Sequence, residues 1–163
     1  MSAWYIIAAM KKDRFTCHVA VGVIILQDNK VLLQKRANTG YSDGLYALPG
    51  GCIDGKEPLT QACVREAKEE LGIDVQLSDL QLVATCHAAG HTGHRPHELL
   101  LFCFQVTKYT GTLQNAEPHK CEEIRFFPLD QLPENSIKSM PKVLACLKNG
   151  SPAYFELDWQ ESC

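Results

Sequence analysis

The chain has 163 residues, a length at which one domain with its own hydrophobic core is the usual solution. Sixteen Lys and Arg residues against nineteen Asp and Glu residues give a net charge of −3, which argues against a protein that binds the phosphate backbone of nucleic acids. Apolar residues make up 45% and charged residues 21% of the chain, which excludes a disordered or collagen-like protein. We expect a single domain over residues 1–163.

The N-terminal segment contains a short apolar run, Trp4 to Met10, ahead of Lys11 and Lys12. A secretory signal has the opposite order, with the positive charge before a longer apolar segment. No stretch approaches the roughly 20 apolar residues of a membrane span. We therefore expect a cytoplasmic protein that is neither exported nor inserted into a membrane.

Eight cysteines are spread along the chain, and because their number is even a disulfide framework has to be weighed. No two form a Cys-x-x-Cys unit, and several lie in apolar runs such as residues 101–104. A chain of this length does not need cross-links to fold. We predict reduced, mostly buried thiols.

The first part of the chain predicts a β-hairpin. Residues 17–26 are apolar on both faces, which is typical of a strand covered on each side. Residues 27–30 are turn formers, and residues 31–36 are the returning strand. A polar loop at residues 38–44 then leads into a short extended piece, residues 45–51, that ends in two glycines.

A helix is expected next, over roughly residues 58–71. Pro58 suits the first helical turn, where its missing N–H does no harm, and Gly72 suits the position just past a helix end. Further strands are predicted at residues 80–86, 99–106 and 121–127, and a last helix from about Pro141 to Asn149-Gly150. Strands outnumber helices, but helices are needed to cover the sheet, so the predicted class is mixed α/β.

Three glutamates lie on one face of the first predicted helix. At about 100° per residue, the i, i+3, i+4 spacing brings Glu66, Glu69 and Glu70 together. Lys68 falls on the opposite side, so the helix does not neutralise these charges itself. One interpretation is a solvated acidic face. The other is a bound cation, because clustered carboxylates are hard oxygen ligands suited to Mg²⁺ or Mn²⁺.

The residues around this acidic face form a longer pattern. Gly51 is followed after five residues by Glu57, and after seven more by Arg65-Glu66-Ala67-Lys68-Glu69-Glu70-Leu71-Gly72-Ile73. This resembles the Nudix box, G-x5-E-x7-R-E-U-x-E-E-x-G-U with U aliphatic. Every fixed position is present, with the small Ala67 at the first U. The resemblance extends over about residues 15–148, through the hairpin, the Leu48–Gly51 segment and the later strands.

The resemblance implies a Nudix fold, an α/β/α sandwich around a mixed β-sheet, and hydrolysis of a diphosphate linkage in a nucleotide. It implies Mg²⁺, with Mn²⁺ as a substitute, bound by four residues of the box: the carbonyl of Gly51, Glu66, Glu69 and Glu70. It further implies that Arg65 belongs to the catalytic set and pairs with Glu57 to orient the loop against the helix, which Gly72 ends. A homodimer is compatible with the resemblance, because dimers are common in the family.

Hydrolysis of such a polyanion requires that its charge be neutralised and that a proton be taken from the attacking water. Bound Mg²⁺ ions align the phosphates and activate the water, and a carboxylate accepts the proton. Glu66 is one candidate for this base. Glu98, at the start of the predicted strand 99–106, is a second, because relatives often have a further carboxylate outside the box. The alternative is that Glu98 is an exposed residue at a strand edge.

Residues 115–130 resemble a stretch with which related MutT-like enzymes often bind a nucleobase. Five residues are candidates for substrate binding: Tyr46, Asn115, Glu123, Phe126 and Phe127. Either phenylalanine would stack on a base, and Glu123 or Asn115 would bind its polar edge. The other interpretation makes the phenylalanines core residues of a strand. Tyr46, where relatives often have Trp, is either a core residue or part of a pocket wall.

Two further patterns are less specific. Gly50-x4-Gly55-Lys56 approaches a phosphate-binding loop, but Glu57 follows where that loop needs a Ser or Thr for Mg²⁺. Four histidines lie between two predicted strands: His87, His91, His94 and His97. They would suit Zn²⁺ or Ni²⁺, but no pair has a helical i, i+4 context, and a polar loop near the substrate is the plainer interpretation.

The sequence thus predicts a Mg²⁺-dependent hydrolase that converts a nucleoside triphosphate, canonical or oxidised, to the monophosphate and pyrophosphate. The alternatives are a nucleotide-sugar pyrophosphatase of the ADP-ribose type and a nucleotide-binding sensor without catalysis. The complete glutamate set argues against the sensor. An RNA substrate is disfavoured by the acidic net charge. We expect a small-molecule nucleotide as the partner and no nucleic acid.

Overall fold

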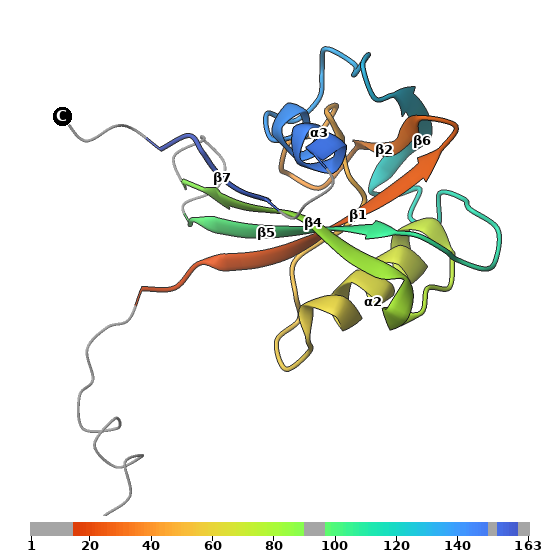
Figure 1. Ribbon diagram of the computed structural model, residues 1–163, viewed down its shortest axis with the longest axis horizontal. Helices are drawn as coiled ribbons and strands as arrows, with labels where there is room; N and C mark the ends of the chain where they lie inside the picture. Colours follow the sequence, from red (N-terminus) through yellow and green to blue (C-terminus); the bar gives the residue numbers. More distant parts are fainter. Residues whose placement is uncertain (1–14, 90–96, 150–152, 160–163) are drawn as a thin grey trace, which may run out of the picture.

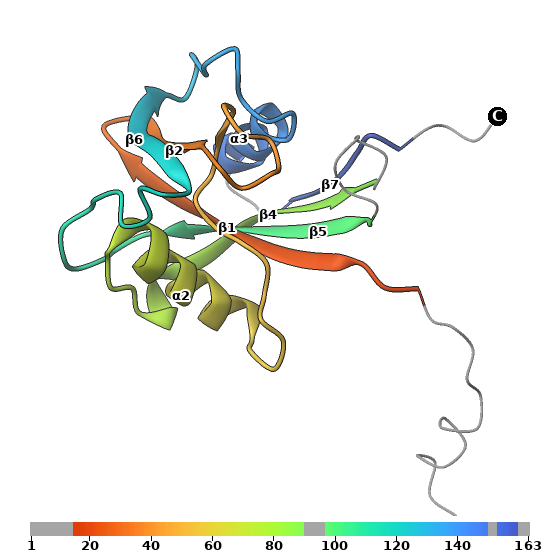
Figure 2. The same ribbon diagram turned by 180° about the vertical axis from the view of Figure 1, so that it is seen from behind.

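A computed structural model describes residues 15–89, 97–149 and 153–159 of the chain. It contains a seven-stranded mixed sheet between two α-helices (Figure 1). The strands are β1 (His18–Gln27), β2 (Lys30–Arg36), β3 (Tyr46–Ala47), β4 (Leu80–Ala88), β5 (Leu99–Val106), β6 (Cys121–Pro128) and β7 (Ala153–Leu157). The helices are α2 (Leu59–Leu71) and α3 (Met140–Asn149), with a 3-10 turn at Leu77–Asp79. Helix α2 lies on one face of the sheet and α3 on the other (Figures 1 and 2), which confirms the predicted mixed α/β sandwich.

Strand β1 lies between two groups of strands, β2, β3 and β6 on one side and β5, β4 and β7 on the other. It pairs with β5 in parallel along its length, from His18 opposite Leu99 to Ile25 opposite Val106. It pairs with β2, antiparallel, only at the hairpin end, so the two strands separate toward the other end of β1. The strand order is β3-β2-β1-β5-β4-β7, and β6 pairs with β2. The segment that contains Gly50 and Gly51 lies in the gap between β1 and β2 and pairs with the backbone of β1.

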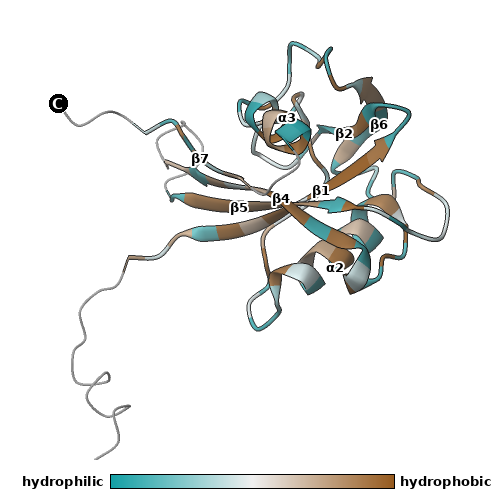
Figure 3. Cartoon of the chain, viewed as in Figure 1, coloured by the Kyte–Doolittle hydropathy of each residue, from teal (hydrophilic) through white to brown (hydrophobic). Residues whose placement is uncertain are grey.

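The central strands are buried on both faces, as the continuous apolar run of β1 predicts. Val21, Val23 and Ile25 point to the core under α2, whereas Ile24 points to the core under α3. Hydrophobic residues dominate the middle of the sheet (Figure 3). Because neighbouring residues of a strand face opposite sides, β1 anchors both helices at once.

Helix α2 has the boundaries that its end signals predict. It begins directly after Pro58, and its C-cap residue Gly72 has the left-handed φ of 72° and donates its N–H to the Lys68 carbonyl. Its buried residues are Ala62, Cys63, Glu66, Ala67 and Leu71. The burial of one glutamate with the apolar residues is unusual, because a carboxylate that loses water needs compensating partners.

The strands predicted at residues 99–106 and 121–127 and the last helix agree with β5, β6 and α3 to within a residue or so. The prediction missed β7 and the 3-10 turn, and it ended the strand at 80–86 two residues short of β4. The seven cysteines among the described residues are free, and five of them are buried, as predicted. Within residues 15–89, 97–149 and 153–159, no helix is long and apolar enough to cross a membrane.

Leu71 anchors the last turn of α2 in the core and is fully buried. We expect Leu71→Ala to lower the free energy of unfolding by about 2–5 kcal/mol, because it removes buried methyl groups and leaves a cavity. Urea unfolding curves measure this loss. Leu77→Ala, at a half-exposed leucine, is the matched control and should cost less than about 1 kcal/mol. Equal losses in the two variants would contradict this description of the core.

Candidate active site

The segment Pro49 to Ile53 lies along β1 in the gap left by β2. Its backbone pairs with that of β1: Val23 donates to the Pro49 carbonyl, Val21 to the Gly51 carbonyl at 2.9 Å, and Ile53 to the Val19 carbonyl. Gly50 has a φ of 135°, and a Cβ there would lie 2.2 Å from the Val21 carbonyl oxygen. Only glycine fits this position, which explains why the first residue of the Gly50-Gly51 pair is a glycine.

Glu66 of α2 lies directly against Gly51. A Cβ on Gly51 would be 2.6 Å from the Glu66 Oε1 atom, so the carboxylate occupies the space that a side chain would fill. Glu66 is only 7% exposed. Burial raises the pKa of the Glu66 carboxyl group, against the opposing effect of Arg65, and the charges of Glu69 and Glu117 raise it further.

Arg65 connects the loop to the acidic face of the helix. Its Nη1 donates to Glu66 Oε1 at 2.8 Å and to Glu69 Oε2 at 3.0 Å. Its Nη2 donates to Glu57 Oε1 at 2.8 Å and to the Cys52 carbonyl at 3.2 Å. The hydrogen bond from Arg65, and after it the one from the Asp54 backbone N–H, hold the pKa of the Glu57 carboxyl group below its usual value. The structure thus brings Arg65 and Glu57 together, as the family resemblance implies.

Glu70 closes the other side of the glycine pair. Its Oε2 accepts the Gly50 N–H at 2.5 Å and the Gln34 side-chain amide at 3.1 Å. Gln34 comes from β2 and is 4% exposed, so this hydrogen bond ties the helix to the far side of the gap. Burial raises the pKa of Glu70 to about 7, despite these two donors.

Within the described residues, no three His, Cys, Asp or Glu side chains are arranged around one point as a preformed metal site. The carboxylates are instead held by Arg65, Gln34 and the loop backbone. Their chemistry nevertheless fits a divalent cation, because they are hard oxygen donors that are buried beside one another. Burial is the main cause of the raised pKa values of Glu66 and Glu70, and neighbouring carboxylates raise them further; a bound dication would oppose both effects.

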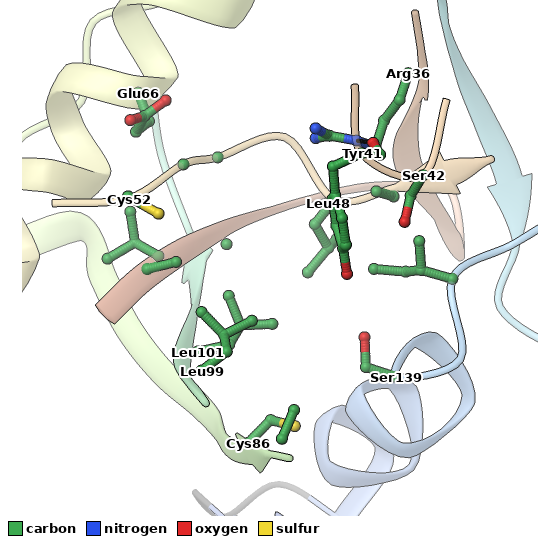
Figure 4. Close-up of a pocket in the computed structure, with 18 of the residues that line it drawn as sticks. Arg36, Tyr41, Ser42, Leu48, Cys52, Glu66, Cys86, Leu99, Leu101 and Ser139 are labelled. Atoms are coloured by element: carbon green, nitrogen blue, oxygen red, sulfur yellow. Dashed lines mark hydrogen bonds between the residues drawn. The ribbon is translucent and has the colours of Figure 1, made fainter. Parts of the chain in front are cut away.

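A cavity of about 760 Å³ opens beside this cluster (Figure 4). At one end it is lined by the catalytic candidates and the loop: Gly50, Gly51, Cys52, Arg65, Glu66, Glu69 and Glu70. Its opposite wall is mostly apolar: Cys86, Ala88, Leu99, Leu101, Met140, Val143 and Leu157. The loop after β2 forms a third wall with Arg36, Thr39, Tyr41, Ser42 and Leu45. The cavity therefore has both charged and apolar walls, so it could contact polar and apolar parts of one ligand.

The structure places the five predicted substrate-binding residues away from the walls of this cavity. Tyr46 is buried, donates its hydroxyl hydrogen to the Glu123 carboxylate and packs edge-on against Phe127, with ring centres 4.8 Å apart. Phe126 points to the opposite core, under α2. This arrangement corresponds to the core interpretation of the aromatic residues, because the alternation of β6 directs one phenylalanine into each core.

Asn115, the remaining member of that set, is also outside the cavity walls. Its side-chain nitrogen donates to the Cys121 carbonyl at 2.8 Å, which ties the preceding loop to β6. Its Oδ1 is buried and has no hydrogen-bond partner among the described residues.

Glu98, the second candidate base, does not line the cavity either. Leu99 and Leu101 face the cavity, so the alternation of β5 turns the residue before Leu99 to the other face of the sheet. Glu98 Oε2 lies 2.7 Å from His87 Nε2 on the neighbouring strand β4. His97 lines the cavity, whereas His91 and His94 lie outside the described residues.

Two parts of the cavity wall contain none of the residues predicted from the sequence. One is the loop after β2, where Arg36 donates to the Tyr41 carbonyl and to the Thr39 hydroxyl, both at 2.9 Å. The other is the end of β7 with the start of α3, where Lys138 and Asp158 meet. The sequence of each segment shows only polar residues in a loop, which do not indicate a binding site. The walls form when segments that are distant in the sequence pack together.

Comparison with known proteins identifies the family. The chain matches the NUDIX domain family over residues 16–147. It is 36% identical over 127 residues to an ADP-ribose pyrophosphatase of Methanocaldococcus jannaschii, covering 77% of this chain and 71% of that protein. It is 38% identical over 102 residues to an 8-oxo-dGTP diphosphatase of Proteus vulgaris, covering 62% and 85% of the two proteins.

A solved structure has the same fold. The crystal structure of a MutT NUDIX hydrolase from Burkholderia pseudomallei superposes with a TM-score of 0.73 at 26% sequence identity. The match covers 81% of this chain and 98% of that one.

The raised pKa of Glu70 makes the stability of the metal-free protein depend on pH. The folded protein keeps a proton on Glu70 up to about pH 7, whereas the unfolded chain releases it near pH 4.5. The free energy of unfolding should therefore fall by about 3 kcal/mol as the pH rises through this window. Glu70→Gln cannot ionise and should lack this decline, so without metal ions it should melt at a higher temperature than the wild type at pH 8.

Thermal unfolding in chelator-treated buffers from pH 4.5 to 8 measures this difference. Glu69→Gln is the matched control, because the Glu69 side chain is 51% exposed and should leave the decline in place. The same pH dependence in wild type and Glu70→Gln would contradict the assignment to Glu70.

Proposed function

Because this chain belongs to the Nudix family of pyrophosphohydrolases, we propose that it cleaves a nucleoside triphosphate, canonical or oxidised, to the monophosphate and pyrophosphate, with Mg²⁺ as its metal ion. One observation carries this proposal: the buried glutamates lie at one end of a cavity whose other wall is apolar. The acidic end suits a metal-bound phosphate chain, and the apolar wall suits a flat nucleobase.

Glu66, Glu69 and Glu70, together with the Gly51 carbonyl, would hold the metal ion. The Gly51 oxygen accepts one hydrogen bond, from Val21, and keeps a second lone pair for a cation. When bound, Mg²⁺ would neutralise the phosphate oxygens and lower the pKa of the attacking water.

Glu66 is the carboxylate that we assign as the proton acceptor. Its Oε1 is bound by Arg65, which leaves Oε2 to take a proton from the attacking water. Glu98 has no comparable position, since its side chain faces the other side of the sheet beside His87.

Arg65 positions this base. Its guanidinium joins Glu66 to Glu57 and to the loop backbone, so the carboxylate is held in one place over Gly51. A planar, permanently charged group with several fixed donors suits this role better than a lysine would.

The ADP-ribose type of substrate is the second candidate, and the relative from Methanocaldococcus jannaschii supports it. Both substrates contain a diphosphate next to a nucleoside, so the glutamate end of the cavity would serve either. The products differ. A triphosphate would give a monophosphate and pyrophosphate, whereas ADP-ribose would give AMP and ribose 5-phosphate.

We expect the protein with Mg²⁺ to release pyrophosphate from at least one member of a panel of canonical and oxidised nucleoside triphosphates. Separation of the products by ion-exchange chromatography distinguishes pyrophosphate from single phosphate and from ribose 5-phosphate. Faster turnover of ADP-ribose than of every triphosphate would replace the first proposal by the second.

We expect Glu70→Gln to lower kcat by at least about a hundredfold while the protein stays folded, because it removes one anionic ligand from the metal site. Excess EDTA should stop the wild-type reaction, and added Mg²⁺ should restore it. Glu122→Gln is the control, since the Glu122 side chain is exposed on β6 and pairs with Lys35. Near-normal turnover in Glu70→Gln, or activity that persists in EDTA, would disprove the proposed metal site.

A further inference from the structure

Strand β7 lies beyond the family match, which ends at residue 147. It pairs in parallel with the edge strand β4, from Ala153 opposite Ala84 to Leu157 opposite Ala88, and extends the sheet on the side away from β2 (Figure 1). The residues at its end line the cavity: Leu157 and Asp158. The family domain therefore does not by itself complete the wall of this pocket.

Several interactions hold the end of β7 in place. The Lys142 ammonium of α3 donates to the Glu156 carbonyl at 2.7 Å, and the Ala89 N–H donates to the Leu157 carbonyl. The Trp159 indole nitrogen donates to the His87 carbonyl at 3.0 Å, and its ring packs edge-on against the His87 ring. Asp158, between these anchors, is thus held at a defined position.

Asp158 has the properties of a ligand-binding residue. Its backbone adopts a left-handed φ of 58°, which aspartate tolerates better than most residues. Its side chain is only 25% exposed, and Oδ1 lies 3.3 Å from the Lys138 ammonium, which also lines the cavity. Among the described residues, none donates a hydrogen bond to Oδ2. The pair therefore offers a donor and free acceptor positions side by side.

We propose that Asp158 and Lys138 determine base specificity by binding the Watson–Crick edge of a guanine nucleotide. This inference rests on the proposed function and deepens it, because it names the base. Guanine has two adjacent donors, N1–H and the N2 amine, next to one acceptor, O6. The two Asp158 oxygens match the two donors, and the Lys138 ammonium matches O6. 8-Oxoguanine has the same edge.

Other bases fit this pair less well. Adenine offers one donor group beside one acceptor, so it uses only one carboxylate oxygen. Uracil and thymine have a single N–H between two carbonyl groups. Cytosine has one amine beside two acceptors. The Asp158 side chain is 25% exposed, so a base that leaves one of its oxygens without a partner should bind less tightly, and this difference produces selectivity.

The apolar surface beside the pair suits the flat face of the base. Leu101 and Cys86 of the sheet lie opposite the start of α3, where the Ser139 side chain lies near the cavity (Figure 4). Met140 and Val143 complete this side. A purine between these apolar groups would present its polar edge toward the end of β7.

Binding of mononucleotides tests the inference without depending on turnover. We would measure Kd values of GMP, IMP, AMP and CMP by calorimetry for the wild type, Asp158→Asn and Glu156→Gln. IMP differs from GMP only in lacking the N2 amine. We expect the wild type to bind GMP at least about tenfold more tightly than IMP, AMP or CMP, as is typical of a hydrogen bond to a charged group.

Asp158→Asn should reduce the GMP-to-IMP ratio to about threefold or less, because the amide offers only one acceptor atom. Asparagine also tolerates the left-handed backbone, so the turn should be preserved. Glu156→Gln makes the same change of charge two residues earlier, on β7, but at an exposed residue outside the cavity walls, and it should keep the wild-type ratio.

Equal affinities of the wild type for GMP and IMP would overturn the inference, even if Asp158→Asn failed to fold. So would an unchanged ratio in a folded Asp158→Asn protein, or no binding of any of the four at millimolar concentration. The outcomes for the two proposals are separate. Triphosphate cleavage without preference for guanine would overturn only the role of Asp158, whereas selective GMP binding without pyrophosphate release would overturn only the proposed function.

Discussion

Two glutamates of α2 pack directly against the backbone of Gly50 and Gly51, and this contact positions the other residues of the site. Gly50 donates its N–H to Glu70, and the carboxylate of Glu66 fills the space beside the Cα of Gly51. Both glycines are in place because the loop pairs with β1 where β2 has separated from it. The sheet topology, the absence of two side chains and the position of the helix thus combine to bury two carboxylates at one end of a cavity.

Burial of these carboxylates costs free energy, and the surrounding residues offset only part of it. Arg65 binds Glu66, and Gln34 binds Glu70, yet the pKa values of both glutamates are raised. A fold optimised for stability alone would place apolar groups here. A bound cation would complete this charge arrangement, and it would connect the stability of the metal-free protein to the proposed chemistry of the site.

Much of the fold and of the acidic cluster could be predicted from local patterns. Pro58 and Gly72 delimit α2, and the spacing of Glu66, Glu69 and Glu70 places them on one face of it. The sequence left the roles of Phe126, Phe127 and Tyr46 open, because an aromatic residue on a strand is equally suited to a core and to a pocket. The neighbours across the sheet make that choice, and here they direct both phenylalanines into the cores. Glu98 is a similar case, since its face depends on the register of β5.

The family, the ends of α2 and the residues of the acidic face can be predicted from local patterns, because these features lie within one helix and its adjoining loop. What lies opposite that face depends on how distant segments pack together. The cavity walls come from the loop after β2, from β4 and β5, from the start of α3 and from the end of β7. Asp158 and Lys138 are 20 residues apart, and their meeting requires β7 to pair with β4 beneath α3. Such a juxtaposition has no periodicity along the chain, because it arises from the packing of separate elements against one sheet.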